Sequence, residues 1–263
     1  ILSGMVACMW TTVSGKSPEG YQEFPGTQEK VRVIQLEPEV RSVIVLPPKV
    51  SKVKPTRLVF FFLPNGNSIE MTAGSRMTTR LDWHYDIQHI AAQTRVVRKM
   101  FPRENLVLAY MEANKRSWPT WAANHPDYIK ILPRILDETA AAVPCPTKDW
   151  VLAAHSGGGG AILRYLESFP EIPSKISRII FLDAIYNYTD ESHGTRLVQW
   201  LKSNPKHALS VISYDDRDVK LDGKNIVSPT GGTWRKTENL ARYLQGPMAL
   251  SLTTSTVMNQ YRD

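Results

Sequence analysis

Apolar residues occur along this chain in short runs of two kinds. Runs rich in valine, isoleucine and phenylalanine and bounded by turn-forming residues predict β-strands, whereas apolar positions three or four residues apart predict helices. The predicted strands cover residues 31–35, 40–46, 57–63, 105–110, 150–154, 176–182, 208–213 and 250–254. The predicted helices cover residues 82–100, 126–142, 160–169, 195–202 and 233–244, and a long loop over 112–124 precedes the second of them.

From residue 57 onward, predicted strands and helices alternate. Residues 58–63 are apolar without a break, which is typical of a strand that is buried on both faces. This pattern predicts an α/β fold, with a mostly parallel sheet and helices on both of its faces. In such sheets, sites gather at the carboxyl ends of the strands, so we expect functional residues directly after a strand.

The composition narrows the classes of function. The chain has 263 residues, 42% of them hydrophobic and 22% charged, which suits a globular protein, and we expect a single domain over residues 16–263. Its two cysteines are too few for a disulfide framework or a cysteine-rich zinc site, and no histidine or carboxylate spacing indicates a metal site. No apolar run approaches the length of about 18 residues that a membrane span needs.

The charge balance is basic, with a formal net charge of +7. Such an excess could favour acidic partners or an anionic envelope surface. Along the sequence the charges are scattered rather than arranged in a stripe, which favours the simpler interpretation of a basic protein without such a partner. No nucleic-acid-binding motif is present, so we expect no nucleic-acid partner.

The residue pattern at both ends of the sequence indicates truncation. Residues 1–10 are apolar and uncharged, and Val13 and Gly15 suit a signal-peptidase cut before Lys16. We therefore interpret residues 1–15 as a truncated signal segment and expect a secreted or periplasmic protein. The alternative is a frayed N-terminus on a cytoplasmic protein. The C-terminus has no clear stop signal, and we expect it to be incomplete.

The most informative stretch is a predicted strand that runs through His-Ser-Gly-Gly into a predicted helix, over residues 151–160. It is similar to the GxSxG nucleophile elbow, with Ala154 in place of the first glycine. Such a turn exposes a serine, here Ser156, and aims the N–H of the next residue, Gly157, at a developing oxyanion. A phosphate-binding loop is the first alternative, but GxxxxGK[ST] is absent and Ile162 stands where a dinucleotide fingerprint needs a small residue. The other is a flexible glycine loop without chemistry.

Over residues 57–245 the chain resembles the α/β-hydrolase superfamily, in a branch with an HSGG elbow and a D-x-x-Y turn, here Asp183 to Tyr186. The resemblance implies a serine hydrolase that cleaves an ester, amide or peptide bond through an acyl-enzyme at Ser156, without a cofactor. It implies a catalytic carboxylate and a histidine, in the order serine, acid, histidine. It does not identify the substrate.

The acid has two candidate positions. Asp183 ends the strand that follows the elbow strand, and it is our first choice. Asp215 or Asp216, after the next strand, is the alternative, and any of the three could instead be a capping residue in a turn.

The histidine base is not identified by position. The histidines are His84, His89, His125, His155, His193 and His207, and none follows the last strand, where the superfamily places the base. The side chain of His155, next to Ser156, is expected to point away from the catalytic pocket. Either the base lies beyond residue 263, or the protein is a degenerate hydrolase that binds a ligand without cleaving it.

Two further groups of residues are candidates for the site. The loop after the 57–63 strand is expected to complete the oxyanion hole through Gly66 and Asn67, although Asn-Gly is also an ordinary turn sequence. Trp118 and Trp121, on the predicted 112–124 loop, could line the substrate pocket or could pack that loop onto the body of the protein.

Overall fold

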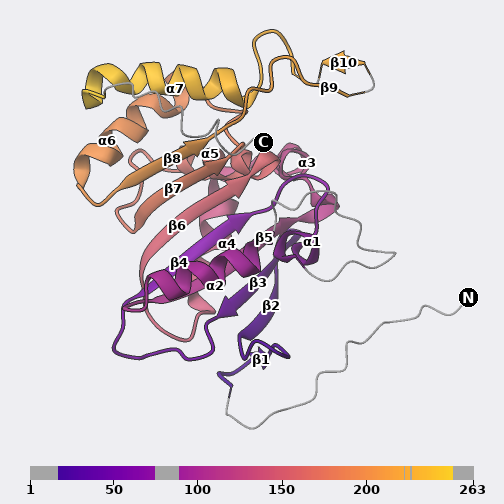
Figure 1. Ribbon diagram of the computed structural model, residues 1–263, viewed down its shortest axis with the longest axis vertical. Coiled ribbons are helices and arrows are strands. Elements are labelled where there is room, and N and C mark those ends of the chain that lie inside the picture. The colour runs from indigo at the N-terminus through magenta and orange to yellow at the C-terminus, as the bar shows by residue number, and fades with distance from the viewer. Residues whose placement is uncertain (1–16, 75–88, 222, 226, 251–263) are drawn as a thin grey trace, which may run out of the picture.

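The protein is built around one large sheet, which a computed structural model describes together with its helices for residues 17–74, 89–221, 223–225 and 227–250 (Figure 1). The sheet has eight strands in the order β1-β2-β3-β5-β4-β6-β7-β8. Their bounds are Gln22–Glu23 for β1, Lys30–Leu36 for β2, Val40–Leu46 for β3, Thr56–Phe62 for β4, Asn105–Ala113 for β5, Thr147–His155 for β6, Ile176–Leu182 for β7 and Ala208–Ile212 for β8. The five strands from β5 to β8 in this order are parallel, and the edge from β1 to β3 is antiparallel.

Helices cover both faces of this sheet, as the sequence pattern predicts (Figure 1). Their bounds are Ile69–Ala73 for α1, Ile90–Met100 for α2, Trp118–Asn124 for α3, Tyr128–Ala141 for α4, Gly159–Glu167 for α5, Thr195–Ser203 for α6 and Thr233–Met248 for α7. The larger core contains side chains from α3 to α7, and the smaller core, on the opposite face, contains side chains from α1 and α2. A small hairpin of β9 (Lys220–Leu221) and β10 (Lys224–Asn225) lies apart from the sheet.

Strand β4 shows why the uninterrupted apolar run indicated a doubly covered strand. Leu58, Phe60 and Phe62 are fully buried in the larger core, whereas Phe61 between them packs in the smaller one. Successive side chains of a strand point to opposite faces, so only a strand with helices on both sides needs apolar residues at every position.

Two parts of the structure differ from the elements predicted from the sequence. The predicted 112–124 loop is wrong, because β5 continues to Ala113 and α3 begins at Trp118. The side chain of Ser117 accepts a hydrogen bond from the N–H of Thr120, and Pro119 occupies the first turn, which are ordinary signals of a helix start. The short helix α1 was not predicted.

The remaining differences fall outside the described residues. The predicted 82–100 helix is observed as α2 from Ile90, and residues 82–88 lie outside the described part, as do residues 251–254 of the predicted last strand. The 1–15 segment and the segment after Leu250 also lie outside it. No helix of the described residues is long and apolar enough to cross a membrane.

The parallel strands bring the candidate site together. Because β4, β6, β7 and β8 run in the same direction, the residues that follow them share one edge of the sheet. That edge carries the turn after Phe62, the Ser156 turn and Asp183, and it is opposite to the edge where the loops before β4 and β5 lie.

Candidate active site

Ser156 lies in a strained turn between β6 and α5. Its φ is +49°, in the left-handed region that residues with side chains rarely adopt. Strand β6 ends at His155, one 3-10 turn covers Ser156–Gly158, and α5 begins at Gly159. Among the described residues the Ser156 hydroxyl has no hydrogen-bond partner. The turn therefore presents a serine at the edge of the sheet, at the start of a helix.

The glycines after Ser156 allow neighbouring backbone to come very close. A Cβ atom on Gly158 would lie 2.3 Å from the carbonyl oxygen of Phe62, and one on Gly159 would lie 1.7 Å from the carbonyl oxygen of Ala184. Any larger residue at either position would have to push β4 or the segment after β7 away. Ala154 is fully buried, so this position before the turn accepts one methyl group.

The loop after β4 lies against the Ser156 turn, but through a different residue from those predicted. A Cβ atom on Gly157 would lie 2.3 Å from Cγ of Asn65, so the Asn65 amide lies directly beside Gly157. The N–H of Gly66 donates to the carbonyl oxygen of Arg116 at 2.8 Å, and the N–H of Asn67 donates to that of Pro64 at 3.4 Å. These two backbone hydrogen bonds hold the loop in shape. Sequence reasoning missed Asn65, although it is the first polar residue after the strand.

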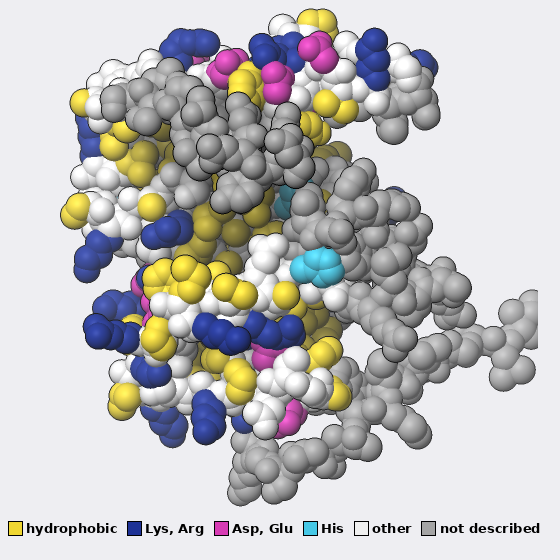
Figure 2. All heavy atoms as spheres, in the orientation of Figure 1, with side chains coloured by type: hydrophobic (Ala, Val, Ile, Leu, Met, Phe, Trp, Pro, Cys, Tyr) yellow, Lys and Arg dark blue, Asp and Glu magenta, His cyan; other side chains and the backbone are white. Residues whose placement is uncertain are grey.

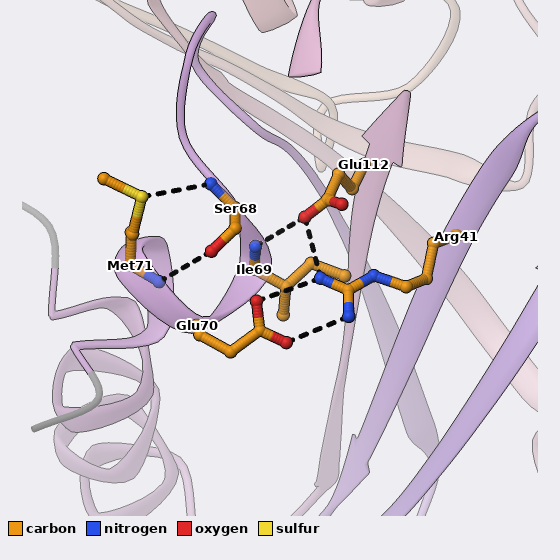
Figure 3. Close-up of polar contacts among 6 residues, drawn as sticks. All are labelled: Arg41, Ser68, Ile69, Glu70, Met71 and Glu112. Carbon is orange, nitrogen blue, oxygen red and sulfur yellow. Dashed lines mark hydrogen bonds and ion pairs between the residues drawn. The ribbon is translucent and has the colours of Figure 1, made fainter. Parts of the chain in front are cut away.

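A partly buried ion network holds this loop on the sheet (Figure 3). The guanidinium of Arg41 on β3 pairs with Glu70 of α1 at 2.9 Å and with Glu112 of β5 at 2.9 Å. Glu112 also accepts the N–H of Ile69 at 2.7 Å, at the start of α1. Burial lowers the pKa of Arg41, but the hydrogen bonds and charges of the two glutamates outweigh it and raise that pKa above its usual value. The network thus fixes the helix that ends the Asn65 loop.

Asp183 follows β7 directly and is held by two hydroxyl groups. Its φ is +48°, its carboxylate accepts a hydrogen bond from the Tyr186 hydroxyl at 3.3 Å, and the Thr233 hydroxyl donates to its other oxygen. Burial raises the pKa of Asp183, and the hydrogen bonds from Thr233 and Tyr186 oppose that rise. The D-x-x-Y pattern of the sequence is therefore a local hydrogen-bonded turn.

The alternative acids have other partners. Asp215 is exposed and pairs with Arg217 at 2.6 Å. Asp216 is fully buried and accepts the N–H of Thr233 at 2.8 Å, so it caps the N-terminus of α7. Thr233 therefore links Asp183 to Asp216, and the nearby charge of Asp216 further raises the pKa of Asp183.

His155 and Asp183 line the same cavity, which has a volume of about 250 Å³. The cavity is otherwise mostly apolar, and its wall includes Phe61, Ile90 and Tyr214. His155 thus faces the cavity of Asp183, and Ser156 is not among the residues that line this cavity. Burial lowers the pKa of His155, although the charge of Asp183 opposes this, so the imidazole is neutral at neutral pH.

The other described histidines have structural partners. His125 and His207 each bring Nδ1 within 2.7 Å of a tryptophan carbonyl oxygen and stack on that tryptophan ring. His193 is buried and pairs with Glu167 at 3.0 Å. His89 begins α2, with a φ of +38°, and His84 lies outside the described residues.

The substrate-lining role expected for Trp118 and Trp121 is wrong. Both side chains are 2% exposed and belong to the larger core. Their rings meet edge to face with centroids 5.5 Å apart, and Trp118 packs in the same way on Phe62 of β4. They anchor α3 to the sheet and present no surface to a ligand.

A resident metal ion has no evident site in the described part of the chain. No group of three or more histidine, cysteine, aspartate or glutamate residues there could hold one. Cys145, the described cysteine, is a free thiol whose Sγ lies 3.3 Å from the Thr56 hydroxyl.

Comparison with known proteins identifies the fold. No family model matches the sequence, and no curated protein matches it. A feruloyl esterase module from Clostridium thermocellum superposes with a TM-score of 0.50 at 7% identity, covering 89% of this chain and 82% of that one. The chain has an α/β-hydrolase fold. Poly(aspartic acid) hydrolase-1 from Sphingomonas sp. KT-1 matches at a TM-score of 0.45 and 13% identity, over 82% of this chain and 84% of that one.

Ser156 lies at a sharp strand-to-helix turn at the carboxyl edge of the sheet, and the loop after β4 that carries Asn65 faces it.

Proposed function

We propose that this protein is a serine hydrolase that cleaves ester bonds through an acyl-enzyme at Ser156. The observation that carries the proposal is the left-handed backbone of Ser156 between β6 and α5, next to glycines whose Cβ atoms would collide with neighbouring backbone. A non-glycine residue is held in this strained conformation only where the surrounding structure enforces it, which is common at active sites. Ester bonds are the first substrates to test, because the feruloyl esterase module shares the fold.

In the proposed reaction, Oγ of Ser156 attacks the carbonyl carbon of the ester while a base takes its proton. The N–H of Gly157 and the side-chain amide of Asn65 stabilise the oxyanion, and the positive end of the α5 dipole adds to this stabilisation. The tetrahedral intermediate collapses, the alcohol leaves with a proton, and water then hydrolyses the acyl-enzyme. Asp183 is the proposed acid, held by Thr233 and Tyr186. No described histidine bonds to Ser156, so the proposal assigns no residue to the base.

The test combines covalent labelling with turnover. We expect a fluorophosphonate probe to label Ser156 and the protein to hydrolyse p-nitrophenyl butyrate. Ser156→Ala should abolish labelling and lower kcat/KM by at least about 10³-fold. The control is Ser192→Ala, which removes an exposed hydroxyl on the segment before α6 and should change neither readout. Hydrolysis that survives Ser156→Ala would contradict the proposal.

A second candidate function is ligand binding on a degenerate hydrolase fold. It is favoured by one observation, that among the described residues no histidine contacts the Ser156 hydroxyl. A serine hydroxyl without an adjacent base is a weak nucleophile. In that case the probe would not label Ser156, whereas an aryl ester would raise the unfolding temperature, since a ligand that binds only the folded state stabilises it.

A further inference from the structure

Two loops that are far apart in the sequence meet at the edge of the sheet opposite to Ser156. The loop before β4 carries Lys49, Lys52 and Lys54, and the end of α2 with the loop before β5 carries Lys99 and Arg103. Lys54 joins the two loops, because its Nζ donates to the carbonyl oxygen of Pro102 at 2.7 Å. We call this surface, together with Val53, Met100 and Phe101, the basic end.

The cations of the basic end are exposed and not neutralised. In the part of the chain that the structure describes, none of the five forms a salt bridge. Glu104 and Asp149 both pair with Arg57, at 2.9 Å and 3.1 Å, so this group leaves a single negative charge against the five cations. A Debye length of about 8 Å at physiological salt lets such a cluster act together on a surface in contact with it.

Apolar side chains project from among these cations. Val53 is 93% exposed, Met100 is 67% exposed and Phe101 is 48% exposed. Figure 2 shows dark-blue and yellow side chains side by side along its left edge, at the level of α2 and the loops beside it. Exposed apolar groups of this size cost solvation free energy in water, which is recovered when they enter an apolar phase.

We propose that the basic end docks the protein on an anionic lipid surface. The cations would contact the lipid headgroups, and Val53, Met100 and Phe101 would enter the boundary with the acyl chains. The chemistry favours a lipid over a single-stranded nucleic acid, because sites for single strands stack bases on several aromatic rings, whereas two of the three protruding residues here are aliphatic. The carboxyl edge with Ser156 lies at the other end of the parallel strands, so docking would leave it open to the medium.

The experiment is co-sedimentation of the whole chain with vesicles. We expect binding to phosphatidylcholine vesicles that contain phosphatidylglycerol, and none to phosphatidylcholine alone. Raising the salt from about 0.1 M to about 1 M shortens the Debye length from ~10 to ~3 Å and should release the protein. No binding to the anionic vesicles, equal binding to both kinds, or binding that survives high salt would overturn the proposal.

Variants distinguish the contribution of the basic end to vesicle binding from the contribution of the protein's net charge. Lys52→Glu, Lys99→Glu and Arg103→Glu together should weaken binding at least about 100-fold, since each cation near a membrane contributes about fivefold in affinity. Val53→Ser with Met100→Ser should weaken it about tenfold and leave its salt dependence unchanged.

The matched control is Lys130→Glu, Lys224→Glu and Arg242→Glu, which changes the net charge equally at exposed positions on α4, β10 and α7. It should retain most of the binding, and an equal loss would show that net charge alone acts and would overturn the proposal. A single-stranded oligonucleotide that binds more tightly than the vesicles at the same salt would overturn the lipid assignment. Unchanged unfolding temperatures of all variants are required for these comparisons.

Discussion

At the scale of single residues, the site depends on where a Cβ atom can fit. The turn after β6 holds Ser156 at positive φ, and the next positions tolerate no side chain because backbone from β4 and from the segment after β7 fills that space. A methyl group added to this turn would therefore lower the stability of the protein because it overlaps neighbouring backbone atoms, and its hydrophobicity would matter little.

Gly159→Ala tests this directly. Its Cβ would lie 1.7 Å from the carbonyl oxygen of Ala184, so we expect a loss of about 2–4 kcal/mol in the free energy of unfolding, measured in urea. Gly246→Ala is the matched control on α7, where no atom beyond its chain neighbours and its own helix backbone lies within 4 Å of the added Cβ. Its effect should stay within about 1 kcal/mol, because the gain in helix propensity is opposed by crowding of the added Cβ against Pro247. Equal effects of the two changes would refute the packing argument.

Asn65 and Asn67 provide a second test at this scale. If the Asn65 amide stabilises the oxyanion, Asn65→Ala should lower kcat for p-nitrophenyl butyrate by about 10²-fold and leave KM nearly unchanged. Asn67→Ala should have little effect, because Asn67 contributes only a turn hydrogen bond to Pro64. A larger loss in the Asn67 variant would reverse the assignment.

His155 makes stability depend on pH. Burial lowers its folded pKa below the usual value of about 6.5, against the opposing charge of Asp183. Between the usual pKa of about 6.5 and the lower folded pKa, the unfolded state binds a proton that the folded state does not. The stability that the neutral imidazole contributes is therefore complete above about pH 6.5 and is lost as the pH falls through the folded pKa. We expect His155→Gln to reduce the fall in unfolding free energy between about pH 7 and pH 5. His193, whose pKa is also lowered by burial, remains in the variant and leaves a residual fall.

At the scale of elements, the ion network of Arg41 joins two strands to the short helix α1. A five-residue helix has little stability of its own, so the loop before it depends on this attachment. Asp216 acts similarly at the other side of the site, because it caps α7 and, through Thr233, holds Asp183.

Arg41→Met should therefore affect both stability and catalysis. It leaves Glu70 and Glu112 as neighbouring carboxylates without their cation, and because these side chains are only partly buried we expect a loss of about 1–2 kcal/mol in unfolding free energy. We also expect a lower kcat, because the Asn65 loop loses its attachment. Arg134→Met removes an exposed pair with Glu138 on α4 and should cost no more than about 1 kcal/mol. Denaturant titrations and ester turnover of both variants give the comparison, and unchanged turnover in Arg41→Met would contradict the positioning role.

At the scale of the whole molecule, the alternation of apolar strands and amphipathic helices was enough to predict the parallel sheet with helices on both faces. That pattern is local, because each strand and each helix face must carry its own apolar residues. The Ser156 turn could be recognised for the same reason, since the strand, the serine and the glycines are consecutive. Trp118 and Trp121 could not be assigned correctly, because a tryptophan in a core and one in a pocket look alike in sequence.

Long-range placement was decided only by the tertiary structure. It puts Asn65 rather than Asn67 beside Gly157, links Asp183 to Asp216 through Thr233, and turns His155 into the cavity of Asp183. It also gathers cations that are scattered in sequence into one basic end. The sequence by itself determined most of the strands and helices and the strained serine turn, because these depend on neighbours along the chain. The partners of each polar group depend on strand order and register, which bring distant residues within a few ångströms of one another.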